Sequence, residues 1–422
     1  MALIKKPTTG MKDILPAEMR IRDYVTQLVK GTYQTFVFTP IETPSVEHIE
    51  NLLSKQGGEN EKLIFKILKR GEKLVLDPNT QEDDLADSGL RYDLTLPLSR
   101  FYAAHAAELP SPFKALQIGP VWRADRPQKG RFRQFVQCDI DILGDPSNLA
   151  EIELITATTT LLGKLDFKDF TVRINDRRIL RAMAESSGFE EKDLDTVFII
   201  LDKMDKIGVE GVKEELVSAG FDSGCTDKYI GLFEGDINGV SYLNELSNRL
   251  AGFLEEECIA GLAGIMESVE KVKNADFNII FDPTLVRGMS YYTGTIFEIT
   301  MNEFGSSVAG GGRYDEMIGK FTGNKVCACG FSIGFERIIT ILLDRDFTPP
   351  KAKEKYAFLI EKGASADFTA SVIKEASNLR AKGSCVLVSM MNKNKKFQKE
   401  QLEKEGFTSD NIREFYHSEF RK

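Results

Sequence analysis

Apolar residues recur along the chain at spacings that predict three helices in its main part. After Pro16, the residues Ile21, Val25 and Leu28 follow at intervals of four and three, on one face of a helix running to about residue 33. Residues 94–105 predict a second helix. A third is indicated by five residues at positions i, i+3, i+4, i+7 and i+8: Phe335, Ile338, Ile339, Leu342 and Leu343.

Between and beyond these helices, shorter apolar runs favour strands. Residues 63–68 and 73–76 flank Arg70-Gly71 and predict a hairpin. Residues 113–144 predict two strands joined by a loop. Further strands are predicted at three places: 36–41, 277–281 and 291–301.

Two changes of character divide the chain. Residues 176–270 are rich in helical sequence, with one Gly/Asp-rich break around 223–239, and predict a helical insertion. A linker marked by Pro349-Pro350 and alternating lysines follows the third predicted helix. After the linker the pattern predicts a small βαβ-type domain with these elements: strands at 356–360 and 385–389 and a helix at about 368–382.

Length and charge narrow the classes of protein that fit this pattern. The 422 residues suffice for two to four domains at roughly 100–200 residues each. With 55 basic and 64 acidic residues the net charge is −9, which excludes a protein that binds nucleic acid through an overall basic surface. The chain up to Pro350 carries −14 and the remaining 72 residues carry +5, so a local basic surface stays open.

Cysteine and histidine usage argues against a metal centre or a disulfide framework. The six cysteines are scattered, and the spacing of Cys327 and Cys329 is unlike that of zinc or redox motifs, so we expect reduced structural thiols. The histidines at 48, 105 and 417 are widely separated, which argues against a catalytic histidine or a histidine-rich metal site. No apolar run resembles a signal peptide or a membrane span, so we expect a cytoplasmic protein.

The segment VWRADRPQKGRFRQFVQCDIDILG, residues 121–144, carries the strongest chemical signal. Its loop holds five cations against one carboxylate: Arg123, Arg126, Lys129, Arg131 and Arg133. That density suits phosphate, although a solvated basic hairpin tip would show it too. In the strand that follows, Gln137, Asp139 and Asp141 share one face because side chains alternate along a strand. Such a surface can hold a zwitterion and a phosphate together.

A tyrosine pair follows an arginine later in the chain, in LVRGMSYYTGTIFEI, residues 285–299. Arg287 and Gly288 precede the strand predicted from residue 291. That strand begins with Tyr291 and Tyr292, a pair that packing alone could explain.

Two glycine-containing segments complete the candidate chemistry. In AGGGRYD, residues 309–315, three glycines would let the backbone approach a ligand closely, or would form a β-bulge or tight turn. In GFSIGFERI, residues 330–338, Arg337 stands in the first turn of the third predicted helix but off its apolar face, as a ligand-binding or a surface arginine would. The sequence contains no Walker lysine loop, dinucleotide fingerprint or nucleophile elbow.

These segments resemble the ordered motifs of class II aminoacyl-tRNA synthetases. Residues 121–144 are similar to motif 2, residues 330–338 to motif 3, and the helix and strand ending at Pro44 to motif 1. The tyrosine and glycine segments together are typical of the histidyl-tRNA synthetase family. The resemblance covers about residues 7–345 and, more weakly, the tail.

The resemblance implies an α+β fold in which helices flank the antiparallel sheet of a class II catalytic domain. It also implies a homodimer formed through motif 1. The domains expected from it are a catalytic domain at 1–175 and 271–345, a helical insertion at 176–270, a linker at 346–352, and a short α/β domain at 353–422 that resembles an anticodon-binding domain.

The family's reaction has two steps. ATP and L-histidine give histidyl-adenylate and pyrophosphate, and the histidyl group then passes to the 3′ end of tRNA(His). The resemblance implies that Arg123 binds the α-phosphate of ATP and the substrate carboxylate, and that Arg337 binds the γ-phosphate. It also implies that Arg287 lies beside the α-phosphate. Fixed cations suffice for such a transfer, because phosphoryl chemistry depends on positioning and electrostatics, and the attacking carboxylate needs no general base. Mg²⁺ would bridge the phosphates, with no cage made of protein ligands alone.

The same resemblance assigns the amino-acid and tRNA contacts. Asp93, Thr95 and Gln137 match the contacts to the α-amino group, Asp141 and Tyr292 match those to the imidazole, and Tyr291 lies beside them. Hydrogen bonds to both ring nitrogens select histidine, because an analogue that lacks them leaves buried polar groups unpaired. The residues that match the region meeting the tRNA acceptor end are Arg126, Lys129 and Arg131.

Three features depart from the family pattern. Asp93 and Asp141 stand where some members have glutamate, and Ser290 stands where many have aspartate. The tail after Pro350 is shorter than the usual anticodon domain and stops resembling one from about Phe407. One alternative is a catalytically silent regulatory paralogue that partners an ATP phosphoribosyltransferase. Such paralogues generally lack the arginine corresponding to Arg287 and the C-terminal domain. Another alternative is a class II synthetase for a different amino acid, which the tyrosine pair disfavours.

Overall fold

A computed structural model describes residues 3–53, 62–77, 80–128, 130–235, 237, 239–286, 291–302, 305–350 and 354–417. Arg287, Gly288, Ser290 and Lys129 lie outside these ranges. The chain forms two compact units, the first from Met1–Asp13 and Val25–Arg345 and the second from Ile14–Tyr24 and Asp346–Lys422.

The strands of the first unit build one large sheet and one small one. The eight-stranded sheet has the order β1-β5-β6-β11-β10-β9-β7-β8 and is antiparallel except for the parallel pairs β1–β5 and β7–β8. A three-stranded antiparallel sheet has the order β2-β4-β3. The strands are β1 (Thr39–Pro40), β2 (Val46–His48), β3 (Lys66–Leu68), β4 (Ala86–Leu90), β5 (Phe113–Trp122), β6 (Gln134–Leu143), β7 (Phe170–Asp176), β8 (Phe277–Phe281), β9 (Thr295–Met301), β10 (Ser306–Arg313) and β11 (Ala328–Gly334).

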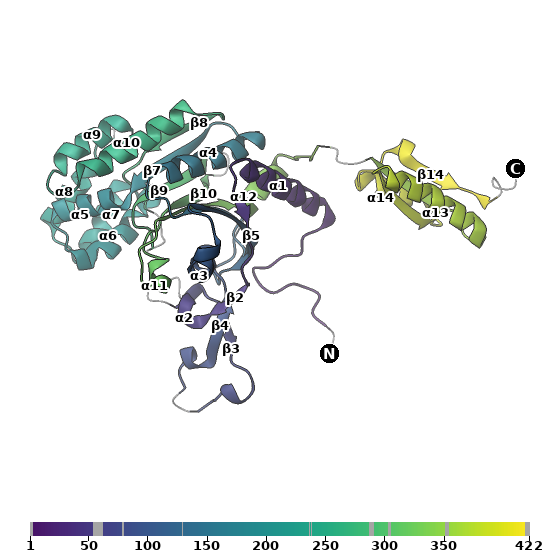
Figure 1. Ribbon diagram of the computed structural model, residues 1–422, viewed down its shortest axis with the longest axis horizontal. Helices are drawn as coiled ribbons and strands as arrows, with labels where there is room; N and C mark the ends of the chain where they lie inside the picture. Colours follow the sequence, from purple (N-terminus) through teal and green to yellow (C-terminus); the bar gives the residue numbers. More distant parts are fainter. Residues whose placement is uncertain are drawn as a thin grey trace. The chain divides into compact units, whose positions relative to one another are not determined.

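Helices flank the large sheet, which curves around α3 (Figure 1). Helix α4 packs on β11, and α12 packs on β6 and β10. A buried ion pair joins this layer to the sheet, because Arg313 of β10 donates from Nε to Glu151 of α4 at 2.7 Å. The helices are α1 (Pro16–Thr35), α2 (Ile49–Leu52), α3 (Thr95–His105), α4 (Leu149–Lys164), α5 (Arg177–Ser187), α6 (Leu194–Leu201), α7 (Met204–Ser218), α8 (Ser223–Ile230), α9 (Val240–Arg249), α10 (Glu256–Lys271), α11 (Gly319–Thr322) and α12 (Phe335–Asp344).

The second unit contains a small parallel sheet in the order β13-β12-β14. Buried apolar clusters lie on both faces of its central strand, one around Leu359 and Leu402 and the other around Phe358 and Phe368. Its elements are β12 (Lys355–Ile360), α13 (Ala366–Ala381), β13 (Cys385–Met390), α14 (Lys395–Lys404) and β14 (Ile412–Phe415). The large antiparallel sheet with flanking helices and the small C-terminal α/β sheet confirm the predicted α+β fold.

Four local predictions need correction. The hairpin around Arg70-Gly71 is wrong, because β3 pairs with β4 instead, and Val75 and Leu76 in the expected second arm are exposed. The strand expected at 36–41 is only Thr39–Pro40, since Val37 takes a left-handed φ of 63°, which a β-branched residue rarely adopts.

The other two corrections concern a helix and a strand boundary. The Gly/Asp-rich break at 223–239 contains helix α8, because Asp222 caps it by accepting a hydrogen bond from the Cys225 amide at 3.0 Å. The strand expected from residue 291 begins at Thr295, so the tyrosine pair precedes the strand. There the Thr293 amide bonds to the Arg313 carbonyl at 2.8 Å.

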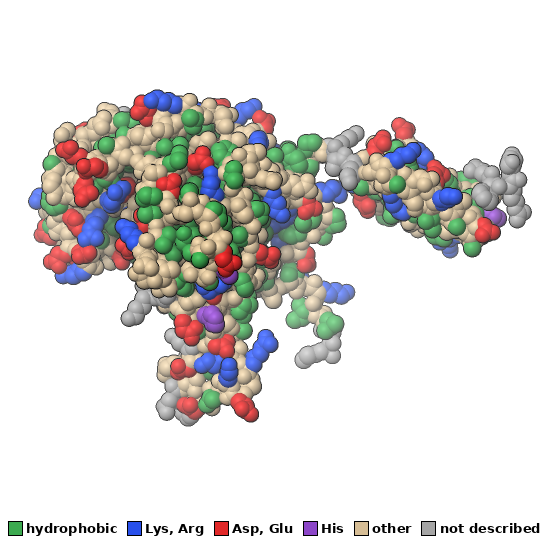
Figure 2. Space-filling view, viewed as in Figure 1, with side chains coloured by type: hydrophobic (Ala, Val, Ile, Leu, Met, Phe, Trp, Pro, Cys, Tyr) green, Lys and Arg blue, Asp and Glu red, His purple; other side chains and the backbone are tan. Residues whose placement is uncertain are grey.

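Acidic and basic side chains are intermixed over the outer face of α5–α10 (Figure 2). In the part of the chain that the structure describes, no helix is long and apolar enough to cross a membrane.

Candidate active site

A cavity of about 370 Å³ opens on one face of the large sheet. It gathers nine of the residues to which the sequence resemblance assigns a contact: Asp93, Thr95, Arg123, Arg131, Gln137, Asp141, Tyr291, Tyr292 and Arg337. Arg126 is exposed and is not among the lining residues, while Lys129 and Arg287 lie outside the described residues. The antiparallel sheet thus brings together segments that are about 240 residues apart in the chain.

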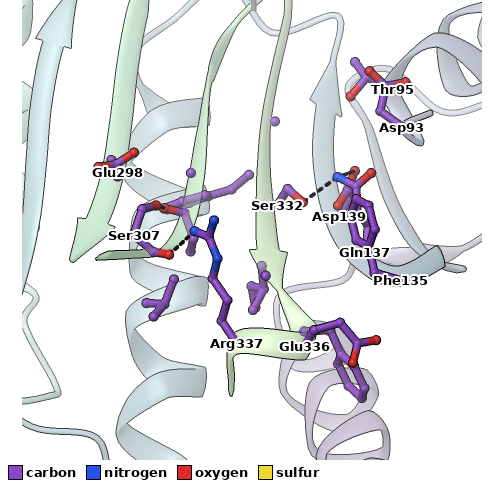
Figure 3. A pocket seen from close by; sticks show the side chains of 18 of the residues that line it. Asp93, Thr95, Phe135, Gln137, Asp139, Glu298, Ser307, Ser332, Glu336 and Arg337 are labelled. Carbon is purple, nitrogen blue, oxygen red and sulfur yellow. Dashed lines mark hydrogen bonds between the residues drawn. The ribbon is translucent and has the colours of Figure 1, made fainter. Parts of the chain in front are cut away.

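The register of the sheet explains how the cavity floor is built. Asp139 of β6 pairs across the strands with Ser332 of β11, and Ser332 pairs with Gly310 of β10. Gly310 in turn pairs with Glu298 of β9. This row of facing residues runs from the Asp139 carboxyl to the Glu298 carboxyl over two small residues. Figure 3 shows the two ends of the site, with Gln137 and Asp139 beside Asp93 and Thr95 on one side and Arg337 and Ser307 on the other.

Close packing requires glycine at two positions, Gly330 in the cavity lining and Gly312 in β10. A Cβ at Gly330 would overlap Oδ1 of Asp141 and lie 3.0 Å from its Cγ. A Cβ at Gly312 would lie 2.6 Å from the Thr295 carbonyl and 2.9 Å from Cδ1 of Tyr292. The glycine run of residues 310–312 lies inside β10, not in a tight turn, and a shift of register between Ser307 and Ala309 precedes it. The glycines therefore let two strands and the tyrosine pair approach closely at the cavity.

Three aspartates in this cavity are almost fully buried, and the pKa of each carboxyl is raised. Burial raises the pKa of Asp141 to about 7, against a hydrogen bond from the Tyr314 hydroxyl at 2.6 Å that lowers it. Burial also raises the pKa of Asp139 well above its usual range, and the neighbouring charge of Asp141 adds to the effect. Burial raises the pKa of Asp93 despite the hydrogen bond that its Oδ1 accepts from the Leu96 amide at 3.1 Å. Such carboxyls favour a cationic ligand.

This burial makes the stability of the ligand-free protein depend on pH. Asp141 binds its proton more tightly in the folded chain than in the unfolded chain, where its pKa is about 3.9. Its stabilising contribution is therefore complete below about pH 4 and is lost as the pH rises through about 7. Between pH 4 and pH 8 we expect the free energy of unfolding of the unaltered chain to fall by about 3 kcal/mol more than that of the Asp141→Asn variant falls. Urea unfolding at both pH values measures this, and equal falls would contradict it.

Several buried acceptor atoms in the cavity make no hydrogen bond within the described residues. They are Oδ2 of Asp93, Oε1 of Gln137, Oδ1 of Asp139 and Oδ2 of Asp141. A buried polar atom without a partner costs free energy, so a native site that holds four of them is built for a ligand that donates hydrogen bonds.

The arginines of the cavity are held by backbone and side-chain contacts. The Nε of Arg123 donates to the Tyr92 carbonyl at 2.9 Å, and its guanidinium lies 5.2 Å from the centre of the Phe135 ring. Arg337 donates to the Ser307 carbonyl, and Arg131 pairs with Asp125 at 2.8 Å. Positive groups on fixed supports opposite buried carboxyls suit a ligand with an ammonium at one end and phosphates at the other.

Comparison with known proteins identifies the family of this chain. Residues 10–338 match the family model of histidyl-tRNA synthetase. The chain belongs to the histidyl-tRNA synthetase family. A histidine–tRNA ligase of Leifsonia xyli subsp. xyli is 46% identical over 353 residues, covering 80% of each chain. A probable histidine–tRNA ligase of Tropheryma whipplei is 40% identical over 418 residues, covering 95% of this chain and 94% of the relative.

Solved structures agree with this family. The crystal structure of histidyl-tRNA synthetase from Nostoc sp. PCC 7120 superposes with a TM-score of 0.75 at 28% identity, covering 96% of this chain and 90% of that one. A Bacillus halodurans structure described as an ATP phosphoribosyltransferase regulatory subunit/histidyl-tRNA synthetase has a TM-score of 0.77 at 21% identity, which shows a shared fold.

Several lining residues of this family member were not assigned to the site from the sequence. Tyr314 and Glu298 belong to the segments AGGGRYD and LVRGMSYYTGTIFEI, and Ser332 and Glu336 belong to GFSIGFERI. Their position inside these segments was the one indication in the sequence that they line the site. Asp139 was part of the polar strand face identified from the sequence, but the resemblance gave it no contact of its own.

Proposed function

We propose that this chain charges tRNA(His) with histidine at the cavity on the large sheet. The observation that carries the proposal is the pairing of unsatisfied buried acceptors with fixed arginines in one site. The function is a ligase reaction that uses ATP, as the family implies. Histidine supplies the ammonium and the ring N–H donors that the acceptors lack, and ATP supplies the anionic oxygens for the arginines.

Histidine would lie across the acceptor end of the cavity. Its ammonium would bind Asp93, Thr95 and Gln137, and its imidazole would bind Asp141 and Tyr292 next to Tyr291. The hydrogen bond from Tyr314 supports this placement, since it fixes Oδ1 of Asp141 and leaves Oδ2 for the ring. A ring that could not donate there would leave a buried carboxylate oxygen unpaired, which is how such a site rejects other amino acids.

The activation step would use the arginines. Arg123 would hold the α-phosphate and the substrate carboxylate, and Arg337 would hold the γ-phosphate. The sequence resemblance adds Arg287 beside the α-phosphate. The ionised histidine carboxylate attacks the α-phosphorus, its new P–O bond replaces the bond to pyrophosphate, and no proton has to move. Fixed cations stabilise the charge that develops on the transferring phosphoryl group.

Mg²⁺ is proposed as a partner of ATP. Within the described residues no cluster of three or more acidic, histidine or cysteine side chains gathers that could hold a metal by itself. Mg²⁺ bound to nucleotide phosphates needs only one or two protein carboxylates. Glu298 and Glu336 line the same cavity and would supply them. The ion would neutralise phosphate charge.

Transfer to tRNA would use the loop between β5 and β6. The exposed Arg126, with Lys129 and Arg131, would meet the acceptor end of tRNA(His). The second unit, whose sequence carries a positive charge, would contact the same tRNA, and salt-sensitive phosphate contacts need only such local cations.

Assembly, location and domain division are further parts of the proposal. We propose a homodimer formed through residues up to Pro44 and a cytoplasmic enzyme. We also propose a catalytic domain at 1–175 and 271–345, an insertion at 176–270, a linker at 346–352 and a C-terminal domain at 353–422. The run of helices from α5 to α10 supports the insertion.

An exchange assay tests the function. The purified chain should exchange pyrophosphate into ATP when histidine is present and with no other standard amino acid, because activation depends on the ring contacts at Asp141. Exchange is measured with labelled pyrophosphate and each amino acid in turn. A well-folded chain without exchange would favour the regulatory paralogue, although Arg123, Arg287, Arg337 and a C-terminal unit are all present and argue against it.

A further inference from the structure

Of the four unsatisfied acceptors in the cavity, Oδ1 of Asp139 is the one whose residue has no contact assigned by the sequence resemblance. An ammonium group carries three N–H donors. Thr95 is one of its three expected partners, but its hydroxyl is already hydrogen-bonded to Tyr291, so it needs the ammonium less than a buried carboxyl oxygen without a partner does. Asp93 and Gln137 each hold one buried acceptor without a partner. If Asp141 serves the ring, the expected partners hold only two such unpaired acceptors for the three donors of the ammonium.

Asp139 supplies the missing acceptor. Its side chain is 3% exposed, and its Oδ1 makes no hydrogen bond within the described residues. Its Oδ2 lies 3.5 Å from Nε2 of Gln137, which also donates to Ser332 at 2.9 Å. Gln137 and Asp139 therefore form one support, and Figure 3 shows them close to Asp93 and Thr95.

The charged groups around Asp139 also favour it as a partner of the ammonium. Asp139 has Asp141 and Asp93 as anionic neighbours, and the cations near it are Arg123 and the buried Arg91. Its cross-strand neighbours are Gln117 of β5 and Ser332 of β11, both uncharged, and the Ser332 hydroxyl is hydrogen-bonded to the Asp139 carboxyl. A buried carboxyl in such surroundings is stabilised most by a ligand cation placed directly against it.

We propose that Asp139 is a further histidine-binding residue, whose Oδ1 accepts a hydrogen bond from the α-ammonium together with Asp93 and Gln137. The inference rests on the proposed function and adds a specificity-determining residue to it. Three acceptors around the three donors of the ammonium leave none of the buried oxygens at this end unpaired. The site would thereby reject imidazole compounds that lack the amino group.

Calorimetric binding to the full chain without ATP tests this assignment. The probes are histidine, histidinol, which keeps the ammonium, and imidazole-4-propionate, which lacks it. In Asp139→Asn we expect the affinity for histidine and for histidinol to fall by about 10- to 50-fold, because a charge-assisted hydrogen bond is lost. The affinity for imidazole-4-propionate should stay within about twofold or rise.

A matched control separates this effect from general loss of stability. Asp176 is 1% exposed, lies outside the cavity and caps α5. Asp176→Asn should leave the affinity for all three probes unchanged. If Asp139→Asn fails to fold, Asp139→Ser should show the same pattern across the probes.

Two results would overturn the assignment. Unchanged histidine affinity in the folded Asp139→Asn variant would show that Oδ1 does not contact the ammonium. An equal loss for all three probes would place Asp139 at the ring or in a structural role. If the unaltered chain bound none of the probes, the proposed function would fail, and this inference with it.

Discussion

Replacing Arg123 by alanine should lower the rate of ATP–pyrophosphate exchange by about 1,000-fold. Arg123 follows β5 directly, its Nε is tied to the Tyr92 carbonyl, and its guanidinium lies against Phe135. The bond uses Nε, so the four N–H groups on its Nη atoms are the ones that a bidentate pair with phosphate oxygens would use. Their positive charge is already oriented before the reaction, and alanine removes it from the position where charge develops.

The conservative variant and a binding measurement make this expectation specific. Arg123→Lys keeps the charge but not the planar pair of donors, so it should recover only part of the lost rate. Histidine binding without ATP should change by less than about fivefold in Arg123→Ala, since the buried acceptors remain. Arg249→Ala, which removes an exposed arginine paired with Glu245 on α9, should match the unaltered chain. Full recovery by lysine, or a large loss of histidine binding, would contradict the proposed role.

Adding one methyl group at Gly330 should raise the KM for histidine by about 100-fold. The new Cβ would overlap Oδ1 of Asp141 and approach Cε1 of Tyr314 to 3.2 Å. Because Asp141 and Tyr314 are both buried, neither can move aside without breaking their 2.6 Å hydrogen bond. The carboxyl proposed for the imidazole would then be displaced, and overpacking should also cost about 1–3 kcal/mol of stability.

A glycine without neighbours provides the control for Gly330→Ala. Gly264 lies within α10, and a Cβ there would meet no atom within 4 Å. Gly264→Ala should leave the KM unchanged and add about 0.5–1 kcal/mol of stability. The measurements are exchange rates over a range of histidine concentrations and thermal unfolding of both variants. A Gly330→Ala variant with the original KM would show that Asp141 does not bind the substrate.

The sequence predicted long elements better than short ones. The helix after Pro16, the two strands of 113–144 and the helix from Phe335 are in the structure because long apolar patterns leave one way to bury their faces. The predicted hairpin at Arg70-Gly71 is wrong because two short runs carry too few apolar residues to specify which strands pair. In the structure β3 pairs with β4. The tyrosine pair was assigned to a strand because aromatic residues favour strands, yet it precedes one.

The sequence alone predicts the class of chemistry. The basic loop, the polar face of residues 137–141 and the ordered motifs suffice to indicate the family and most of the cavity residues, because side-chain alternation in a strand is fixed by covalent geometry. Only the tertiary structure decided which oxygens are left without partners. Whether Asp139 and Asp141 are satisfied depends on what β5, β10 and β11 place opposite them, and that register comes from long-range strand pairing. The same pairing buries the carboxyls of Asp139 and Asp141 together and so raises their pKa values, which no local pattern contains.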